Sequence, residues 1–184
     1  MLTTLRFQVG LLSLMQALLL TNNVTLIAVN GLAGLQLADN KLLATLPVTG
    51  YVLGGAVWSM PAAAFMRRFG RRAGYTVGSV VAMLGAVLAW HAMTLGSLAL
   101  LCVATFVCGL YNAFGASLRF AAADVADAYR PHFKARAISL VLTGGIAGGV
   151  IGPEISKWSR EWLPAQFAGT YLTLVGFAFA SLLL

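Results

Sequence analysis

The sequence predicts an all-α polytopic membrane protein, with six transmembrane helices in a single bundle over residues 1–184. Of its residues, 60% are hydrophobic and only 9% are charged, whereas ordinary soluble domains carry about 25% charged residues. Long apolar runs fill most of the chain, and an apolar helix of about 20 residues spans a ~30 Å hydrocarbon core. The arginines gather on one set of the loops between these runs, which is typical of membrane proteins.

A turn and a basic block separate the first three spans. The span at about 7–29 is longer than the 7–15 apolar residues of a secretion signal, so we expect it to stay in the mature protein. A turn-prone stretch around Asn40 precedes the second span, at about 43–66. The arginine-rich block 67–72 then ends that span and precedes the third, at about 73–92.

Short polar interruptions also separate the last three spans. A tight uncharged turn at 94–97 precedes the fourth span, at about 98–118. A charged loop at 124–136 leads to the fifth span, at about 137–155, and the last span covers about 166–184. Each connection is short, so no stretch is left for a catalytic domain outside the membrane.

The distribution of basic residues predicts the orientation. One side of the expected bundle, which includes the amino terminus, carries eight lysines and arginines, or nine with Arg119, and the other side carries three. The eight are Arg6, Arg67, Arg68, Arg71, Arg72, Arg130, Lys134 and Arg136, and the three are Lys41, Lys157 and Arg160. Basic residues accumulate on cytoplasmic loops, so we expect both termini in the cytoplasm. The same rule explains the net charge of +7 without a nucleic acid partner.

Polar side chains within the spans are the first candidates for function, because such groups are costly in hydrocarbon without a partner or water. Gln16, Asn23 and Asn30 recur every seven residues. Seven residues turn a helix by about 700°, so the three side chains share one face. This stripe either forms hydrogen bonds between helices or lines an aqueous cavity.

The fourth span carries a second stripe. Cys108, Asn112, Gly115 and Arg119 follow at four-, three- and four-residue steps, which places them on one helix face. Arg119 is a charge within a span, and such a residue is a functional hypothesis by default. The alternative is an arginine that extends to the cytoplasmic surface and pairs with Asp124.

The fifth span combines small residues with a proline. Gly148 and Gly152 allow another helix to approach closely, and Pro153 predicts a bend. Glu154 follows near the outer end, either as a protonatable coupling group or as a hydrated loop carboxylate. The sequence has no cluster of metal ligands and no nucleophile–base arrangement, so we expect no metal, no cofactor and no enzymatic activity.

The basic block contains a recognisable motif, Arg68-Phe69-Gly70-Arg71-Arg72. It resembles the signature loop between the second and third helices of the major facilitator superfamily. That family usually has an aspartate where this chain has Arg67, and Asp124 matches the position of another acidic residue of the family. Gly148-xxx-Gly152-Pro153 resembles the glycine-proline motif of the same superfamily.

The resemblance covers the entire chain and matches the amino-terminal six-helix half of a twelve-helix fold, built from 3+3 helix repeats. It implies secondary active transport of a small solute by alternating access across a bacterial inner membrane. In that fold the first and fourth helices line the substrate cavity. The cavity residues are then expected to be Gln16, Asn23, Asn30, Asn112 and Arg119. The residues of the conformational loop are expected to be Arg68, Gly70, Arg71, Arg72 and Asp124.

A six-helix half needs a second half, because alternating access rocks two bundles around a central site. We expect that half to be a second copy in a homodimer, a separate chain, or a missing carboxyl-terminal half. The competing hypothesis is a membrane protein that does not transport but regulates or assembles another complex. The two hypotheses differ in whether Asn23 and Arg119 can be replaced without loss of function.

Overall fold

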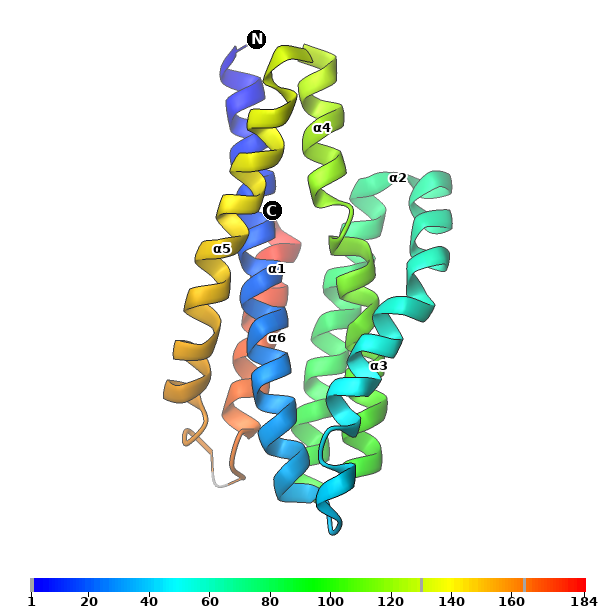
Figure 1. Cartoon of the computed structure of the whole chain (residues 1–184), viewed down its shortest axis with the longest axis vertical. Helices are drawn as coiled ribbons and strands as arrows, with labels where there is room; N and C mark the ends of the chain where they lie inside the picture. Colours follow the sequence, from blue (N-terminus) through cyan, green and yellow to red (C-terminus); the bar gives the residue numbers. More distant parts are fainter. Residues whose placement is uncertain (1, 130, 164) are drawn as a thin grey trace.

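The computed structural model describes residues 2–129, 131–163 and 165–184, and within these ranges every regular element is a helix. Figure 1 shows the helices running roughly along one long axis. In chain order they are α1 (Leu2–Leu37), η1 (Lys41–Leu43), α2 (Leu46–Leu95), α3 (Leu98–Gly115), α4 (Leu118–Tyr129), η2 (Pro131–Phe133), α5 (Lys134–Ser159) and α6 (Ala168–Leu183). Arg130, counted above with the basic side, lies outside the described residues.

Several helical stretches are apolar and long enough to cross a membrane. Within the described residues there are four of them, at Leu5–Leu37, Lys41–Leu95, Leu98–Tyr129 and Lys134–Ser159. Ala168–Leu183 is also apolar but shorter. The predicted all-α membrane protein is therefore confirmed.

Helix α2 changes direction at one residue. Gly70 has φ 87° and ψ 164°, whereas the residues on both sides continue the helix. Glycine adopts such a φ without the steric penalty of a side chain. Figure 1 shows the chain turning back at this point, and we call residues 46–69 the first arm and residues 71–95 the second arm. The block 67–72 was expected to be a loop, but only Gly70 leaves the helical conformation.

The fourth predicted span is interrupted near its end. Helix α3 stops at Gly115 and α4 begins at Leu118. In the gap, the Ser117 hydroxyl donates to the carbonyl oxygen of Phe114 at 2.8 Å. Arg71 donates from its guanidinium to the carbonyl oxygen of Ser117 at 3.2 Å. Glycine and serine near each other are a common cause of helix kinks.

Glycines bring α5 very close to α1. A Cβ atom added to Gly148 would overlap the carbonyl oxygen of Ala17, and one added to Gly152 would lie 2.9 Å from the carbonyl oxygen of Thr21. The Thr21 hydroxyl also donates to the carbonyl oxygen of Gly148 at 3.1 Å. The two backbones can pack this closely only because α5 has no side chains at these positions.

Helix α3 packs on both arms of α2 in the same way. A Cβ atom added to Gly54 of the first arm would overlap the carbonyl oxygen of Phe106. In the second arm, a Cβ atom added to Gly85 would lie 2.5 Å from the sulfur of Cys108. The two arms and α3 therefore form one tightly packed unit.

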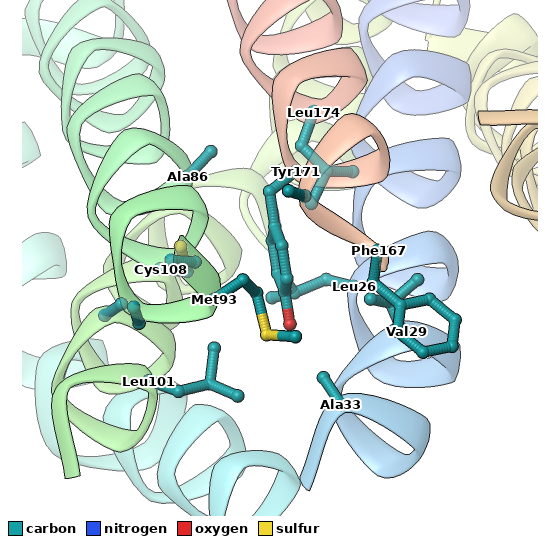
Figure 2. Close-up of a cluster of buried hydrophobic side chains, with 14 of the residues drawn as sticks. Leu26, Val29, Ala33, Ala86, Met93, Leu101, Cys108, Phe167, Tyr171 and Leu174 are labelled. Atoms are coloured by element: carbon teal, nitrogen blue, oxygen red, sulfur yellow. The ribbon is translucent and has the colours of Figure 1, made fainter. Parts of the chain in front are cut away.

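The apolar core lies between this unit and the helices α1 and α6. Figure 2 shows Tyr171 of α6 reaching into it, among side chains from the other helices. Tyr171, Leu174 and Leu101 are fully buried there, as are Val29 and Ala33 of α1. The core thus fixes the position of α1, which carries the first polar stripe.

Candidate functional site

Three uncharged polar side chains from three helical segments meet inside the bundle. The Tyr51 hydroxyl, on the first arm of α2, donates to Oδ1 of Asn23 on α1 at 2.6 Å. Nδ2 of Asn23 in turn donates to Oδ1 of Asn112 on α3 at 2.9 Å. Asn23 is only 7% exposed, and Asn112 is half-buried. We call Tyr51, Asn23 and Asn112 the Asn23 cluster.

Small residues make room for this cluster. Gly109 of α3 lies so close to Gly54 that an added Cβ atom would be 2.8 Å from the Cα atom of Gly54. The neighbouring Gly55 faces Asn112, since an added Cβ atom there would lie 3.3 Å from Nδ2 of Asn112. The close packing of α2 on α3 therefore places Asn112 within reach of α1.

The other two members of the first stripe point to different neighbours. Asn30 is fully buried and accepts a hydrogen bond from the Tyr171 hydroxyl of α6 at 2.7 Å. We call these two residues the Asn30 pair. Gln16 is half-buried and lies beside Gly145 of α5, where an added Cβ atom would be 3.2 Å from Cγ of Gln16. The stripe therefore contacts α5, then α2 and α3, then α6, and it does not form one continuous site.

Arg119 is separated from Asn112 by the break between α3 and α4. Its side chain is exposed, with the guanidinium carbon 5.1 Å from the centre of the Phe120 ring. The alternative of a pair between Arg119 and Asp124 was wrong, because the salt bridge of Asp124 is made with Arg71. The expected four-residue step from Gly115 to Arg119 does not hold, because the helix ends between them.

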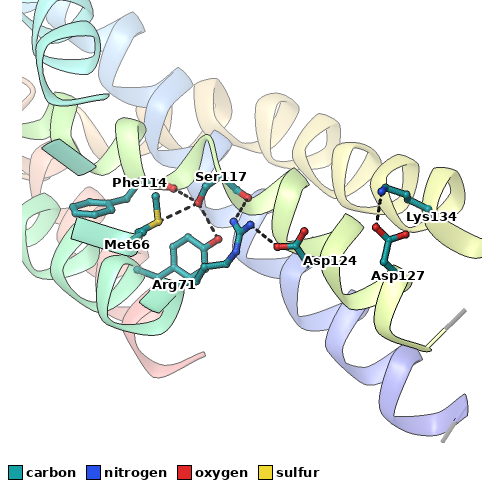
Figure 3. Close-up of polar contacts among 8 residues, drawn as sticks. Met66, Arg71, Phe114, Ser117, Asp124, Asp127 and Lys134 are labelled. Atoms are coloured by element: carbon teal, nitrogen blue, oxygen red, sulfur yellow. Dashed lines mark hydrogen bonds and ion pairs between the residues drawn. The ribbon is translucent and has the colours of Figure 1, made fainter. Parts of the chain in front are cut away.

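The basic loop is tied to α4 by an ion pair. Nη2 of Arg71 lies 2.5 Å from a carboxylate oxygen of Asp124, and Figure 3 shows this contact beside the hydrogen bond from Arg71 to the backbone of Ser117. The Tyr75 hydroxyl is 3.0 Å from the Ser117 hydroxyl. One arginine therefore links the reversal of α2 to the break between α3 and α4 and to α4 itself.

The remaining loop residues lie at the surface. Arg68 is exposed, with its guanidinium carbon 5.3 Å from the centre of the Phe69 ring. Arg72 is also exposed, and Gly70 forms the reversal itself. Among the described residues expected in the conformational loop, the ion pair joins Arg71 and Asp124.

The end of α5 carries the last predicted residues. Pro153 lies inside α5, which continues to Ser159. Glu154 is exposed and forms an ion pair with Lys157 at 2.7 Å. Gly152 contacts α1 near Thr25, where an added Cβ atom would lie 2.8 Å from the Thr25 hydroxyl oxygen.

Two tyrosines that were not predicted as site residues supply partners of the polar stripe: Tyr51 donates to Asn23 and Tyr171 donates to Asn30. Asn22, beside the stripe, donates from Nδ2 to the carbonyl oxygen of Leu174 at 3.1 Å. The available signal was the chemistry of tyrosine, because a buried tyrosine hydroxyl usually finds a hydrogen-bond partner. Within the described ranges, no group of three or more metal-binding side chains occurs.

An open cavity of about 600 Å³ lies away from the Asn23 cluster, toward the basic loop. Its walls come from α1, the second arm of α2, α4 and the last residues of α6. Arg71 and Asp124 contribute to it, whereas Asn23 and Asn112 do not. The predicted cavity residues and this cavity are thus different regions of the bundle.

Known proteins that resemble this chain are transporters. The chain is 38% identical over 172 residues to the riboflavin transporter RfnT of Brucella anthropi, an alignment that covers 93% of this chain and 42% of RfnT. It is 31% identical over 136 residues to YddS of Bacillus subtilis, an uncharacterized MFS-type transporter, which covers 74% of this chain and 30% of YddS. The chain is a homologue of MFS-type transporters. No protein-family model matches it.

The predicted resemblance to the major facilitator superfamily is confirmed by these relatives. A third, the uncharacterized MFS-type transporter YdeG of Bacillus subtilis, is 27% identical over 129 residues. The chain spans 42% of the length of RfnT and 30% of the length of YddS. It is therefore similar to a part of each transporter, in agreement with an MFS-type half.

Proposed function

We propose that this chain forms one half of a secondary transporter that moves a small solute of the riboflavin class by alternating access. The observation that carries the proposal is the 38% identity to a riboflavin transporter over 93% of this chain. Alternating access requires two bundles around a central site. The second bundle in the proposal is a second copy, a separate chain, or a further part of the same protein.

The chemistry of the Asn23 cluster supports a neutral solute. Asn23, Asn112 and Tyr51 are uncharged, and each can donate or accept hydrogen bonds. A heterocycle rich in carbonyl and N–H groups fits such a site, because polar groups that leave water need partners inside the protein. Asn23 lies on α1, the first predicted span, and Asn112 lies on α3, which is the fourth. According to the family resemblance, these two spans line the cavity.

The proposed architecture is six spans arranged as a 3+3 repeat. In it, α1 and the two arms of α2 are the first three spans, and α3 with α4, α5 and α6 are the last three. Two similar seams support the repeat: α5 packs its glycines against carbonyl oxygens of α1, and the first arm of α2 packs its glycines against carbonyl oxygens of α3. In each seam, the second helix of one repeat packs on the first helix of the other.

Leucine substitutions test the two seams. Gly148→Leu and Gly54→Leu are expected to abolish recovery of folded protein, since both would overlap a backbone carbonyl oxygen. Gly149→Leu is the matched control for Gly148, because an added Cβ atom there meets nothing within 4 Å. Normal recovery of the Gly148 and Gly54 variants from detergent would contradict the packing on which the repeat rests.

The proposed orientation places both termini and the Arg71–Asp124 pair in the cytoplasm of a bacterial cell, at the inner membrane. In this position the pair acts as a conformational latch, since it joins the reversal of α2 to α4. Arg68, Gly70 and Arg72 complete the latch loop in the proposal. Glu154, on the opposite side, is the proposed coupling carboxylate. Single cysteines placed near either end, labelled from one side of intact cells, test this orientation.

Riboflavin uptake tests the proposed function. A riboflavin-auxotrophic bacterium without its own transporter would express the protein that carries this chain, and uptake of labelled riboflavin would be compared with empty vector. Asn23→Ala and Arg119→Ala are measured beside the wild type, with Asn40→Ala as an exposed asparagine control. Loss of uptake in Asn23→Ala, at unchanged protein amount, supports the proposal.

Other results favour the second hypothesis. Uptake at the level of empty vector by the wild type would contradict the riboflavin class. Wild-type flux in both the Asn23→Ala and Arg119→Ala variants would contradict the cavity assignment. A protein that carries no solute, but whose removal changes the assembly of another membrane complex, would be a non-transporting partner.

A further inference from the structure

We propose that Asn112 determines solute specificity by donating a hydrogen bond from its free amide nitrogen to a carbonyl oxygen of the solute. Asn23 and Tyr51 are positioning residues that hold this amide in one orientation. The inference deepens the proposed function and rests on it. The juxtaposition that carries it is the chain of two hydrogen bonds, 2.6 Å from Tyr51 to Asn23 and 2.9 Å from Asn23 to Asn112.

The direction of these hydrogen bonds sets the polarity of the site. The Tyr51 hydroxyl donates, so the oxygen of Asn23 faces Tyr51 and its nitrogen faces Asn112. The oxygen of Asn112 then faces the nitrogen of Asn23 as the acceptor. The oxygen of Asn112 therefore already accepts a hydrogen bond, whereas its NH2 group keeps both of its donors, and Nδ2 of Asn112 is the group that we assign to the solute.

This donor is accessible. Among the described residues, Nδ2 of Asn112 makes no hydrogen bond, and the atom is not fully buried. The residue itself is half-buried. Gly55 keeps the space beside the nitrogen open, because an added Cβ atom would lie only 3.3 Å from it. The donor therefore combines a fixed direction with an open approach.

The matching solute group is the carbonyl oxygen of a neutral heterocycle, such as the imide edge of a flavin. A carbonyl oxygen is a good acceptor, whereas a thiocarbonyl sulfur at the same place is a weak one. A site whose polar group loses its partner discriminates against the altered ligand. From the net strength of one hydrogen bond, the expected preference is about three- to tenfold.

The test measures uptake of labelled riboflavin in competition with unlabelled riboflavin and its 2-thio and 4-thio analogues. For the wild type, one thio analogue is expected to compete about three- to tenfold less well than riboflavin. Asn112→Ala is expected to reduce riboflavin uptake and to remove this preference. Tyr51→Phe is expected to weaken the preference, because the orientation of Asn23 is no longer fixed.

Asn22→Ala is the matched control. Asn22 also donates between helices, to the carbonyl oxygen of Leu174 at 3.1 Å, but it does not belong to the Asn23 cluster. Its replacement is expected to reduce the amount of protein and to leave the preference per molecule unchanged. If Asn112→Ala fails to reach the membrane, Gly55→Ala is tested in its place. The added Cβ atom crowds Nδ2 of Asn112 and is expected to lower the preference for riboflavin over the thio analogue.

The outcomes separate the two proposals. If the wild type takes up riboflavin and both thio analogues compete as well as unlabelled riboflavin does, the role of Asn112 is overturned. The proposed function is left standing by that result. A full preference retained in Asn112→Ala, or in Gly55→Ala where that variant decides, would overturn it too. No riboflavin uptake by the wild type would overturn the proposed function, and this inference with it.

Discussion

Two asparagines on one helix, seven residues apart, have the same kind of partner but very different surroundings. Asn23 and Asn30 each accept a hydrogen bond from a tyrosine hydroxyl, at 2.6 Å from Tyr51 and 2.7 Å from Tyr171. Nδ2 of Asn23 donates a hydrogen bond to Asn112, whereas Nδ2 of Asn30 is buried and has no hydrogen-bond partner among the described residues. The Asn23 cluster thus ends at an accessible donor, and the Asn30 pair is enclosed in the core.

A polar residue that recurs along a membrane helix therefore does not keep the same role at each position. The neighbour decides the role: α2 and α3 leave Asn112 half-buried beside Asn23, while α6 covers Asn30 completely. A substitution at Asn30 should therefore act on stability, and one at Asn23 should act mainly on transport.

Asn30→Asp is expected to have the largest effect. A carboxylate at this fully buried position beside the Tyr171 hydroxyl costs several kcal/mol. We expect almost no folded protein, measured as the monodisperse fraction after extraction in detergent. Asn23→Asp is the matched control, with two polar neighbours in its cluster, and should be recovered in larger amount. Equal recovery of the two variants would remove the contrast.

Tyr171→Phe is expected to have the next largest effect. It leaves Oδ1 of Asn30 without its hydrogen bond, in addition to the unpartnered nitrogen, and should cost about 1–3 kcal/mol of stability. The measurement is the melting temperature in detergent by tryptophan fluorescence. Tyr51→Phe should lower the melting temperature less, because Asn23 keeps its hydrogen bond to Asn112. A larger shift for Tyr51→Phe would reverse our interpretation.

A double substitution tests whether the Asn30 pair contributes only its buried hydrogen bond. Replacing both members of a buried hydrogen bond by apolar groups is often nearly neutral. Asn30→Leu with Tyr171→Phe is therefore expected to melt within about 1 kcal/mol of the wild type, at a higher temperature than Tyr171→Phe alone. Riboflavin uptake should be retained. A double variant less stable than either single variant would show that Asn30 has a role beyond the pair.

The Arg71–Asp124 pair provides an exposed reference with the smallest expected effect on stability. Its side chains are 38% and 64% exposed, and pairs in water contribute about 0–1 kcal/mol. Asp124→Asn should change the melting temperature only slightly. If the pair acts as a latch, the variant should still change the rate of riboflavin uptake, and the exchange Arg71→Asp with Asp124→Arg should restore part of it.

The sequence predicted the membrane class and the helical regions well, because both depend on local composition. The apolar runs and the polar interruptions near Asn40 and at 94–97 are read directly from the chain. The reversal at Gly70 was placed in the correct block but expected to be wider. Helix propensity of the surrounding arginines keeps the helix intact up to the glycine on both sides.

The contacts of the polar residues could not be predicted to the same extent. Periodicity placed Gln16, Asn23 and Asn30 on one face, but that face meets three different neighbours along its length. Partner identity depends on helices that are distant in sequence, such as α6 for Asn30. The break before Arg119 could not be predicted from hydropathy, because the hydrogen bond from the Ser117 hydroxyl to the carbonyl oxygen of Phe114 does not change the hydropathy of the segment.

The seam between α1 and α5 has a consequence for how the protein is made. Ser13 donates to the carbonyl oxygen of Leu140, a residue 127 positions later in the chain. The two arms of α2 and α3, by contrast, are consecutive and can assemble as soon as they leave the ribosome. Helix α1 must therefore enter the bilayer before its partners on α5, the carbonyl oxygens of Leu140 and Gly148, have been translated. During this interval the Ser13 hydroxyl faces the lipid or the insertion machinery instead of the carbonyl oxygen of Leu140, so the surroundings of α1 change when α5 arrives.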